Sequence, residues 1–201
     1  MNNHITLHLV RLTLAPICVV LVISGCVDGN RNRHLDSNLA YGKLNPEAPR
    51  ETFQFGQLVG KWDVISSDSI PNEGWHESKA TWTFMYTLDG FAVQDIWHEK
   101  VSDSTSNTKG IGRDFTGINV RVFDPNTKQW NITWFENGTN TMQAVITAKT
   151  NMKGEIVMKP PNYPAEITFY NIAEHSFDWK FEILKEDKRI LFSKMSAKRS
   201  G

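Results

Sequence analysis

The sequence has few cysteines and no excess of charge of either sign. Only 2 of its 201 residues are cysteine, and the 22 basic residues balance 22 acidic ones. Cys18 lies inside an N-terminal apolar run and Cys26 follows it, so a mature chain that begins at Cys26 has a single thiol and no internal disulfide. A chain without a basic excess lacks the surface that nucleic-acid binding requires, which excludes that class of partner.

Several signatures of enzymes and metal sites are also missing. The chain has no Gly-x-Ser-x-Gly elbow, no P-loop and no Gly-x-Gly-x-x-Gly fingerprint. Its 6 histidines are scattered, and His98 stands directly beside Glu99 rather than at a spacing that shares one face of a strand. The sequence therefore predicts no metal site, no cofactor and no known catalytic motif.

An apolar run marks the N-terminus. Arg11 precedes residues 12–24, which are apolar except for a threonine, a proline and the closing serine. A basic lead, an apolar stretch of roughly 7–15 residues and small residues before a cleavage point describe a secretory signal. The run is short for a permanent membrane span of about 20 residues. We therefore expect residues 1–25 to be removed as a signal peptide.

The end of this run, Ile23-Ser24-Gly25-Cys26, resembles the lipobox of bacterial lipoproteins. The resemblance implies that Cys26 carries acyl chains, such as palmitate, and that these chains insert into a lipid bilayer. Val27 is not the aspartate that retains many lipoproteins at the inner membrane, so the resemblance favours the periplasmic face of the outer membrane. An ordinary signal peptide with a coincidental cysteine is the alternative.

The rest of the chain divides by composition. Residues 26–50 are polar and follow neither the helical nor the strand period, which is typical of a flexible tether. A short helical turn is expected over residues 51–58. Residues 51–201 are enough for one domain with a buried core, and they show no internal repeat.

From residue 60 onward, apolar residues recur at every second position, which is the period of a β-strand. Phe177, Trp179 and Phe181 alternate with charged residues, so one face meets a core and the other meets water. Turn sequences such as Asp89-Gly90 separate the runs. The pattern predicts about ten strands, at residues 61–66, 80–87, 91–100, 116–123, 129–135, 141–149, 155–159, 166–172, 177–183 and 190–197.

Consecutive strands with short connections and no long amphipathic helix form a meander. An open meander leaves two exposed edges, and closure removes them. We therefore predict an all-β fold, an up-and-down antiparallel β-barrel of about ten strands. A β-sandwich is the alternative arrangement.

Two sets of residues resemble known barrel families. Gly60-Lys61-Trp62, together with Arg199 after the last strand, is similar to the Gly-x-Trp motif and closing arginine of lipocalin-type barrels. Residues 88–97, 121–125 and 176–179 resemble an uncharacterised bacterial family of lipocalin-like barrels, a domain of unknown function, as do Trp130 and Trp134. These resemblances imply a lipocalin- or calycin-like barrel in which Arg199 covers the indole of Trp62. They imply no reaction.

Six of the seven tryptophans fall on predicted strands, and only Trp75 falls in a predicted loop. A barrel of about eight strands is filled by side chains or holds one small ligand, and more strands enclose more space. The sequence therefore predicts a ligand cavity, with the following tryptophans in its wall: Trp82, Trp97, Trp130, Trp134 and Trp179. The alternative is that the rings simply fill the interior.

Asp95 and Arg121 are charged residues expected on the same face as the tryptophans. If the turn over residues 124–129 pairs Phe123 with Trp130, Arg121 lies opposite Ile132. If Glu99 pairs near Phe115, Asp95 lies beside Asn119, and all these side chains project to one side. A buried charge is costly unless it is paired, so an Asp95–Arg121 ion pair is one interpretation. In the other, Arg121 binds an anionic group of a ligand. The opposite assignment of faces, with Arg121 in water, stays open.

These features favour a lipid-anchored barrel that binds a small, largely apolar ligand, with an anionic end as one option. Its partners would be that ligand and the bilayer reached through Cys26. A second hypothesis is an isomerase- or hydratase-like enzyme in which Asp95 acts as a general acid or base. A third is a packed interaction module of an envelope assembly, with an exposed apolar patch.

Overall fold

The computed structural model describes residues 40–100, 112–142 and 145–201. The chain divides into two units, Met1–His34 and Leu35–Gly201, and the described residues all belong to the second. The predicted signal peptide and Cys26 therefore lie outside the described residues. Within these described ranges, no helix has the length and apolar character needed to cross a membrane.

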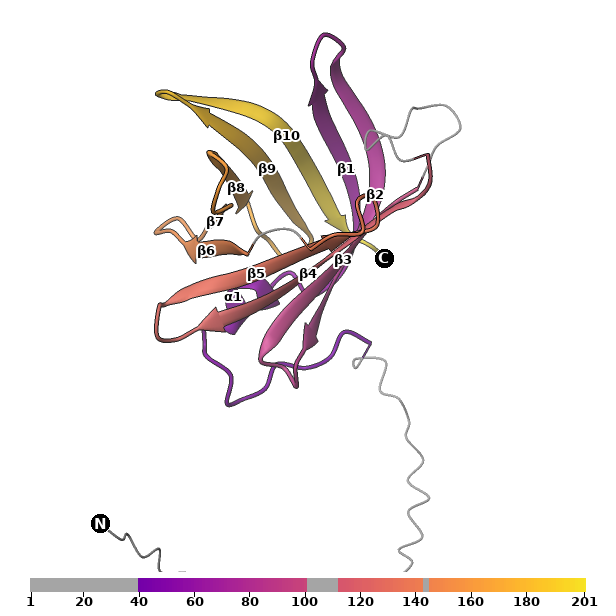
Figure 1. Cartoon of the computed structure of the whole chain (residues 1–201). Coiled ribbons are helices and arrows are strands. Elements are labelled where there is room, and N and C mark those ends of the chain that lie inside the picture. The colour runs from indigo at the N-terminus through magenta and orange to yellow at the C-terminus, as the bar shows by residue number, and fades with distance from the viewer. Residues whose placement is uncertain (1–39, 101–111, 143–144) are drawn as a thin grey trace, which may run out of the picture. The chain divides into compact units, whose positions relative to one another are not determined.

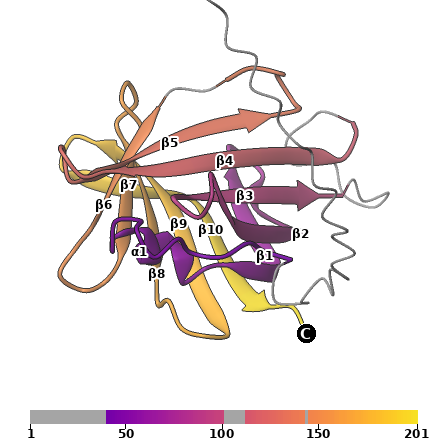
Figure 2. The same cartoon turned by 90° about the horizontal axis from the view of Figure 1, so that it is seen from below.

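The second unit is a closed antiparallel barrel of ten strands, preceded in the described residues by one short helix (Figures 1 and 2). Each strand pairs with the next along the chain, and β1 pairs with β10 to close the sheet. The predicted all-β, up-and-down barrel is confirmed, and the sandwich is excluded. The elements are α1 (Thr52–Gly56), β1 (Gly60–Ile70), β2 (Gly74–Thr87), β3 (Ala92–Glu99), β4 (Phe115–Asp124), β5 (Gln129–Glu136), β6 (Ile146–Thr150), β7 (Ile156–Lys159), β8 (Ala165–Tyr170), β9 (Ser176–Lys185) and β10 (Lys188–Arg199).

The β1–β2 hairpin is longer than the sequence pattern predicts. Trp75, which was expected in a loop, lies in β2 opposite Ser69 of β1. The outer half of this hairpin, which rises at the top of Figure 1, has no clean alternation of buried and exposed residues. Without one buried face the period of two is lost from the sequence, although the backbone ladder continues.

The register of the central strands places the predicted residues inside. β4 buries every second residue: Phe115, Gly117, Asn119, Arg121 and Phe123. Arg121 pairs with Ile132, as the turn over residues 124–129 predicts, and Asp95 pairs with Asn119, as the predicted pairing of Glu99 with Phe115 requires. Arg121 is 1% exposed, whereas its neighbour Val122 is 38% exposed. The assignment of Arg121 to the solvent face is therefore excluded.

Helix α1 lies across one end of the barrel, which we call the closed end (Figure 2). The ring of Phe55 packs edge-on against Trp130, with 4.8 Å between centroids, and against Phe169 at 5.9 Å. The Oε1 of Gln54 accepts a hydrogen bond of 2.9 Å from Nε1 of Trp130. The helical turn expected over residues 51–58 is thus present, and it seals the interior on this side.

The chain ahead of α1 also contacts the closed end. The backbone N–H of Tyr86 donates to the carbonyl of Tyr41 at 2.7 Å, and Nδ2 of Asn45 donates to the carbonyl of Asp89 at 3.0 Å. Gly90 has φ +82°, and a side chain there would collide with the backbone of residues 43–45. The tether expected to end at residue 50 therefore packs on the barrel from Tyr41 onward. It does so through hydrogen bonds, which leave no hydrophobic period in the sequence.

Arg199 and Trp62 form the contact that the lipocalin resemblance implies. The guanidinium carbon of Arg199 lies 4.2 Å from the centroid of the Trp62 ring. Arg199 also donates to the carbonyl oxygens of Val59, at 2.9 Å, and Glu174, at 2.8 Å. The Trp62 indole donates to the carbonyl of Leu58 at 2.7 Å. These bonds join the first strand, the last strand and the segment after α1 at the closed end.

Candidate functional site

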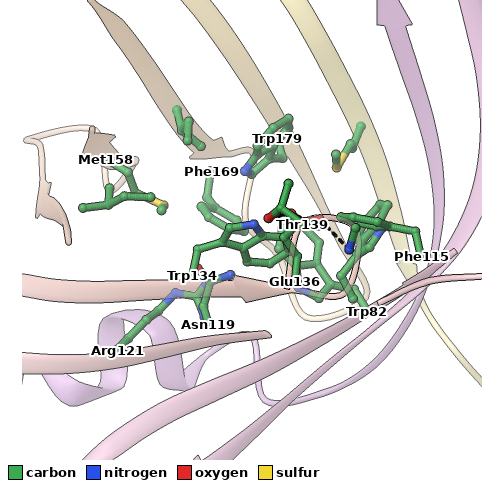
Figure 3. Close-up of a pocket in the computed structure, with 15 residues that line it drawn as sticks. Trp82, Phe115, Asn119, Arg121, Trp134, Glu136, Thr139, Met158, Phe169 and Trp179 are labelled. Carbon is green, nitrogen blue, oxygen red and sulfur yellow. Dashed lines mark hydrogen bonds between the residues drawn. The ribbon is translucent and has the colours of Figure 1, made fainter. Parts of the chain in front are cut away.

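The interior of the barrel contains a cavity of about 490 Å³ (Figure 3). This volume falls in the range of small-molecule sites, roughly 300–1,000 Å³. The large rings in its wall belong to Trp82, Trp97, Phe115, Trp134, Phe169 and Trp179. Asn119 and Arg121 line it toward the closed end, and Glu136 and Thr139 line it where β5 ends. The cavity is therefore an aromatic chamber with few polar groups.

Four of the five predicted tryptophans line this cavity, and Trp130 does not. Trp130 is fully buried at the closed end, where its ring packs against Phe55 and lies 5.6 Å from Phe123. It shares the inward face of β5 with Trp134, but it sits nearer to α1. Strand alternation predicts the face on which a side chain lies, but it does not predict the depth of that side chain in the barrel. The sequence therefore did not show that Trp130 belongs to the packed closed end.

The sequence pattern does not identify several of the lining residues as ligand contacts: Phe115, Asn119, Ile146, Met158, Ile167, Phe169 and Met195. A signal was present for Asn119, because the predicted register already placed it beside Asp95 on the inward face. The apolar residues carry no such signal, since a ring or thioether in a packed core gives the same sequence pattern.

Asp95 and Arg121 form a buried ion pair between the Arg121 Nη2 and the Asp95 Oδ2. Asp95 is fully buried, and it also accepts hydrogen bonds from the backbone N–H of Asn119 at 3.2 Å and from its Nδ2 at 3.1 and 3.2 Å. Burial lowers the pKa of Arg121, while the charge and hydrogen bond of Asp95 oppose that shift. The carboxylate thus offsets the desolvation of the guanidinium.

The guanidinium of Arg121 is further enclosed by two rings. Its carbon lies 4.8 Å from the centroid of Phe55 and 5.5 Å from that of Phe84. Among the described residues its Nε and Nη1 have no hydrogen-bond partner. The structure therefore contains the ion pair that one interpretation of the sequence predicts. Asp95 itself does not line the cavity.

The end of the cavity opposite α1 is bordered by an ordered turn after β5. The side chain of Asn137 accepts from the backbone N–H of Thr116 at 2.9 Å and donates to the carbonyl of Asp114 at 3.0 Å. The backbone N–H of Thr139 donates to Glu136 at 3.0 Å. We call this border, residues 136–139, the rim. The polar loop predicted over residues 102–107 lies outside the described residues.

Across the parts of the chain that the structure describes, no group of three or more His, Cys, Asp and Glu side chains is arranged to hold a metal ion. The ring of His98 has two polar neighbours, and its Nδ1 lies 3.1 Å from the hydroxyl of Thr116. Its Nε2 lies 3.7 Å from a carboxylate oxygen of Asp114. This is a local polar contact on the outside of the barrel.

Comparisons with known proteins support the fold. No family model matches the chain, and no curated protein matches it. The S-type phycobiliprotein lyase CPES from Guillardia theta superimposes with a TM-score of 0.53 at 15% identity, covering 73% of this chain and 90% of that one. Rv2717c from M. tuberculosis superimposes with a TM-score of 0.54 at 9% identity, covering 79% and 100%. The chain therefore has a closed, calycin-like barrel fold.

Proposed function

We propose that this protein binds a small, largely apolar molecule inside its barrel, and that it does so as a lipoprotein of the bacterial envelope. The observation that carries the binding function is the cavity of about 490 Å³ with its aromatic wall. Transfer of apolar surface from water to such a wall is favourable by roughly 25 cal/mol per Å². A molecule with an elongated or multi-ring hydrocarbon group buries the most apolar surface, so it gains the most free energy from this transfer.

The size of the cavity favours a binding site over a packing defect. Protein interiors ordinarily hold few voids larger than a water molecule, because unfilled space forfeits contacts. Here large rings are present on facing strands, for example Trp82 on β2, Trp134 on β5 and Trp179 on β9, and they nevertheless leave the space open. The third hypothesis from the sequence, a packed interaction module, predicts that side chains fill this space.

The similar structures add support at the level of architecture. One of them is named as a phycobiliprotein lyase. At 15% identity that likeness carries only the barrel to this chain. The class of ligand proposed here rests on the lining of this cavity alone.

No contact among the described residues favours the enzymatic hypothesis through Asp95. A general acid or base must come within hydrogen-bond reach of the reacting group. Asp95 is fully buried behind Asn119 and Arg121, and both of its oxygens are engaged by these two residues. The proposal therefore assigns binding and no reaction.

Binding can be tested with the unit Leu35–Gly201, which holds the closed barrel and its core and so meets the requirements of an independent domain. The purified unit is extracted with organic solvent, the extract is examined by mass spectrometry, and fluorescent long-chain probes are titrated while tryptophan emission is followed. We expect a co-purifying apolar compound or saturable probe binding. Absence of both would contradict the proposal.

A matched pair of variants links binding to the cavity. Ile167 lines the cavity, whereas Ile65 is 48% exposed on the outside of β1. Ile167→Trp fills the space and should weaken probe binding at least about tenfold, while Ile65→Trp should not change it. Equal binding by both variants would show that the probe binds elsewhere.

The anchor is the second part of the proposal, and the sequence Ile23-Ser24-Gly25-Cys26 supports it. We place the acylated Cys26 in the periplasmic leaflet of the outer membrane. Membrane fractionation with and without globomycin tests this, because that inhibitor blocks cleavage before a lipidated cysteine. Cells grown with labelled palmitate should label the unchanged protein and leave Cys26→Ser unlabelled. Label on the variant, or no label on the unchanged protein, would contradict lipidation at Cys26.

A further inference from the structure

The cavity floor is lined by Asn119 and Arg121, and the fully buried Asp95 lies behind them. Asn119 is 6% exposed, and it lines the cavity. Its Nδ2 donates to both oxygens of Asp95, at 3.1 and 3.2 Å. A carboxylate accepts hydrogen bonds and donates none, so this contact fixes which end of the amide is nitrogen. The Oδ1 of Asn119 therefore points away from Asp95, and no donor among the described residues reaches it.

The same floor carries no net charge. The positive charge of Arg121 is matched by the carboxylate of Asp95, and its Nε and Nη1, which have no partner among the described residues, are buried beside the rings of Phe55 and Phe84. An anionic head group at the floor would find no unbalanced positive charge, and it would meet the partial negative charge of Asn119 Oδ1. Because burial of an unpaired charge is costly, a carboxylate is poorly suited to this position.

We propose that the cavity selects neutral apolar molecules that end in a hydroxyl group, and that this hydroxyl donates a hydrogen bond to Oδ1 of Asn119. The proposal rests on the binding function proposed above and names the chemical class of its ligand. A hydroxyl supplies the donor that the amide oxygen lacks and brings no charge into the apolar chamber. An ester of the same length supplies no donor, and a carboxylate supplies neither a donor nor neutrality.

Three probes with one hydrocarbon chain separate these cases. The unit Leu35–Gly201 is titrated at neutral pH with dodecanol, methyl dodecanoate and dodecanoate, and dissociation constants are measured by displacement of a fluorescent probe. We expect dodecanol to bind about tenfold more tightly than the ester, as one net hydrogen bond allows. Dodecanoate should bind more weakly than the alcohol by at least about the same factor.

A matched pair of variants tests the role of Asn119. Asn119→Leu removes the amide from the floor, and Asn131→Leu makes the same change on the exposed side of the adjacent strand β5. The first variant should abolish the preference for the alcohol over the ester, and the second should retain it. If Asn119→Leu fails to fold, the three-probe comparison on the unchanged chain decides the question by itself.

The outcomes separate this inference from the function on which it rests. Equal affinity for the alcohol and the ester, or equal or tighter binding of the carboxylate, would overturn the selectivity and leave the binding function standing. Failure of all three probes to displace the fluorescent ligand would overturn the proposed occupant class. Failure of the fluorescent ligand itself to bind would overturn the binding function and this inference with it.

Discussion

The benzene part of the Trp134 indole lies against the Cα of Gly117 on the neighbouring strand β4. A Cβ built on Gly117 would collide with three carbon atoms of that ring, Cη2, Cζ2 and Cζ3. Trp134 is also within ring contact of Phe115, with 6.4 Å between centroids. The missing side chain at Gly117 thus lets a large indole lie against the sheet instead of projecting across the cavity.

Gly117→Ala should push the Trp134 ring into the cavity. Overpacking of this kind costs about 1–3 kcal/mol, so we expect the free energy of unfolding in urea to fall by that amount and probe binding to weaken. Trp134→Phe removes the colliding ring, and the double variant should recover most of the loss. Strictly additive effects of the two substitutions would show that the contact is not the cause.

Asp95→Asn should be strongly destabilising, because it leaves the guanidinium of Arg121 buried without its counter-charge. Breaking a buried ion pair from one side costs about 3–5 kcal/mol. Glu51→Gln is the control, since the side chain of its partner Arg50 is 94% exposed and surface pairs contribute about 0–1 kcal/mol. Urea unfolding at neutral pH measures both. Similar small losses in the two variants would contradict a role for Asp95 in balancing the buried charge.

Trp130 and Trp134 should respond differently to a ligand. Trp130 is packed at the closed end, and Trp134 lines the cavity. Trp130→Phe should cost about 1–3 kcal/mol of stability and leave the ligand-induced change in tryptophan emission intact. Trp134→Phe should reduce that emission change. A reduced emission change in the Trp130 variant would place the ligand at the closed end.

The stability of the barrel should fall at alkaline pH in part through Tyr86. Its hydroxyl lies against Gly56 of α1, and burial raises the pKa of Tyr86 above its ordinary value of 10.0. The unfolded chain therefore loses this proton at a lower pH than the folded chain, so the contribution is complete below about pH 10 and is lost as pH rises through the folded pKa.

Tyr86→Phe removes this contribution, and its profile of unfolding free energy against pH should fall less steeply above about pH 10. Below about pH 9 the two profiles should run parallel, offset only by the change in packing. Denaturant titrations across this range supply the measurement. Identical alkaline slopes in the two proteins would rule out Tyr86 as a source of the pH dependence.

Much of the architecture was predictable because turn sequences and strand alternation are local features of the sequence. The turn over residues 124–129 fixes the pairing of Phe123 with Trp130, and alternation then carries Arg121 and Asn119 inside. The depth of each ring was not predictable in the same way. It depends on where α1 meets the sheet, and this contact joins Gln54 to Trp130, which lie far apart in the chain.

The predicted boundaries failed where tertiary contacts replace periodicity. The ladder of the β1–β2 hairpin continues to Ile70 and Gly74, beyond the predicted strand ends, and β6 begins at Ile146 rather than at residue 141. The open space between the rings was predicted from the strand number and the tryptophans on the strands, and the direction of the Asn119 amide had no signal in the sequence. The direction of the Asn119 amide is set by its hydrogen bonds to Asp95, whereas the sequence predicts only that these two residues are neighbours.

The attachment of Tyr41 and Asn45 beside the β2–β3 turn has a practical consequence. A reporter, affinity tag or immobilisation linker joined ahead of Tyr41 would leave the barrel at the face sealed by α1. The rim at residues 136–139 belongs to the opposite face. Surface-coupled measurements through an N-terminal linkage would therefore leave the rim uncovered.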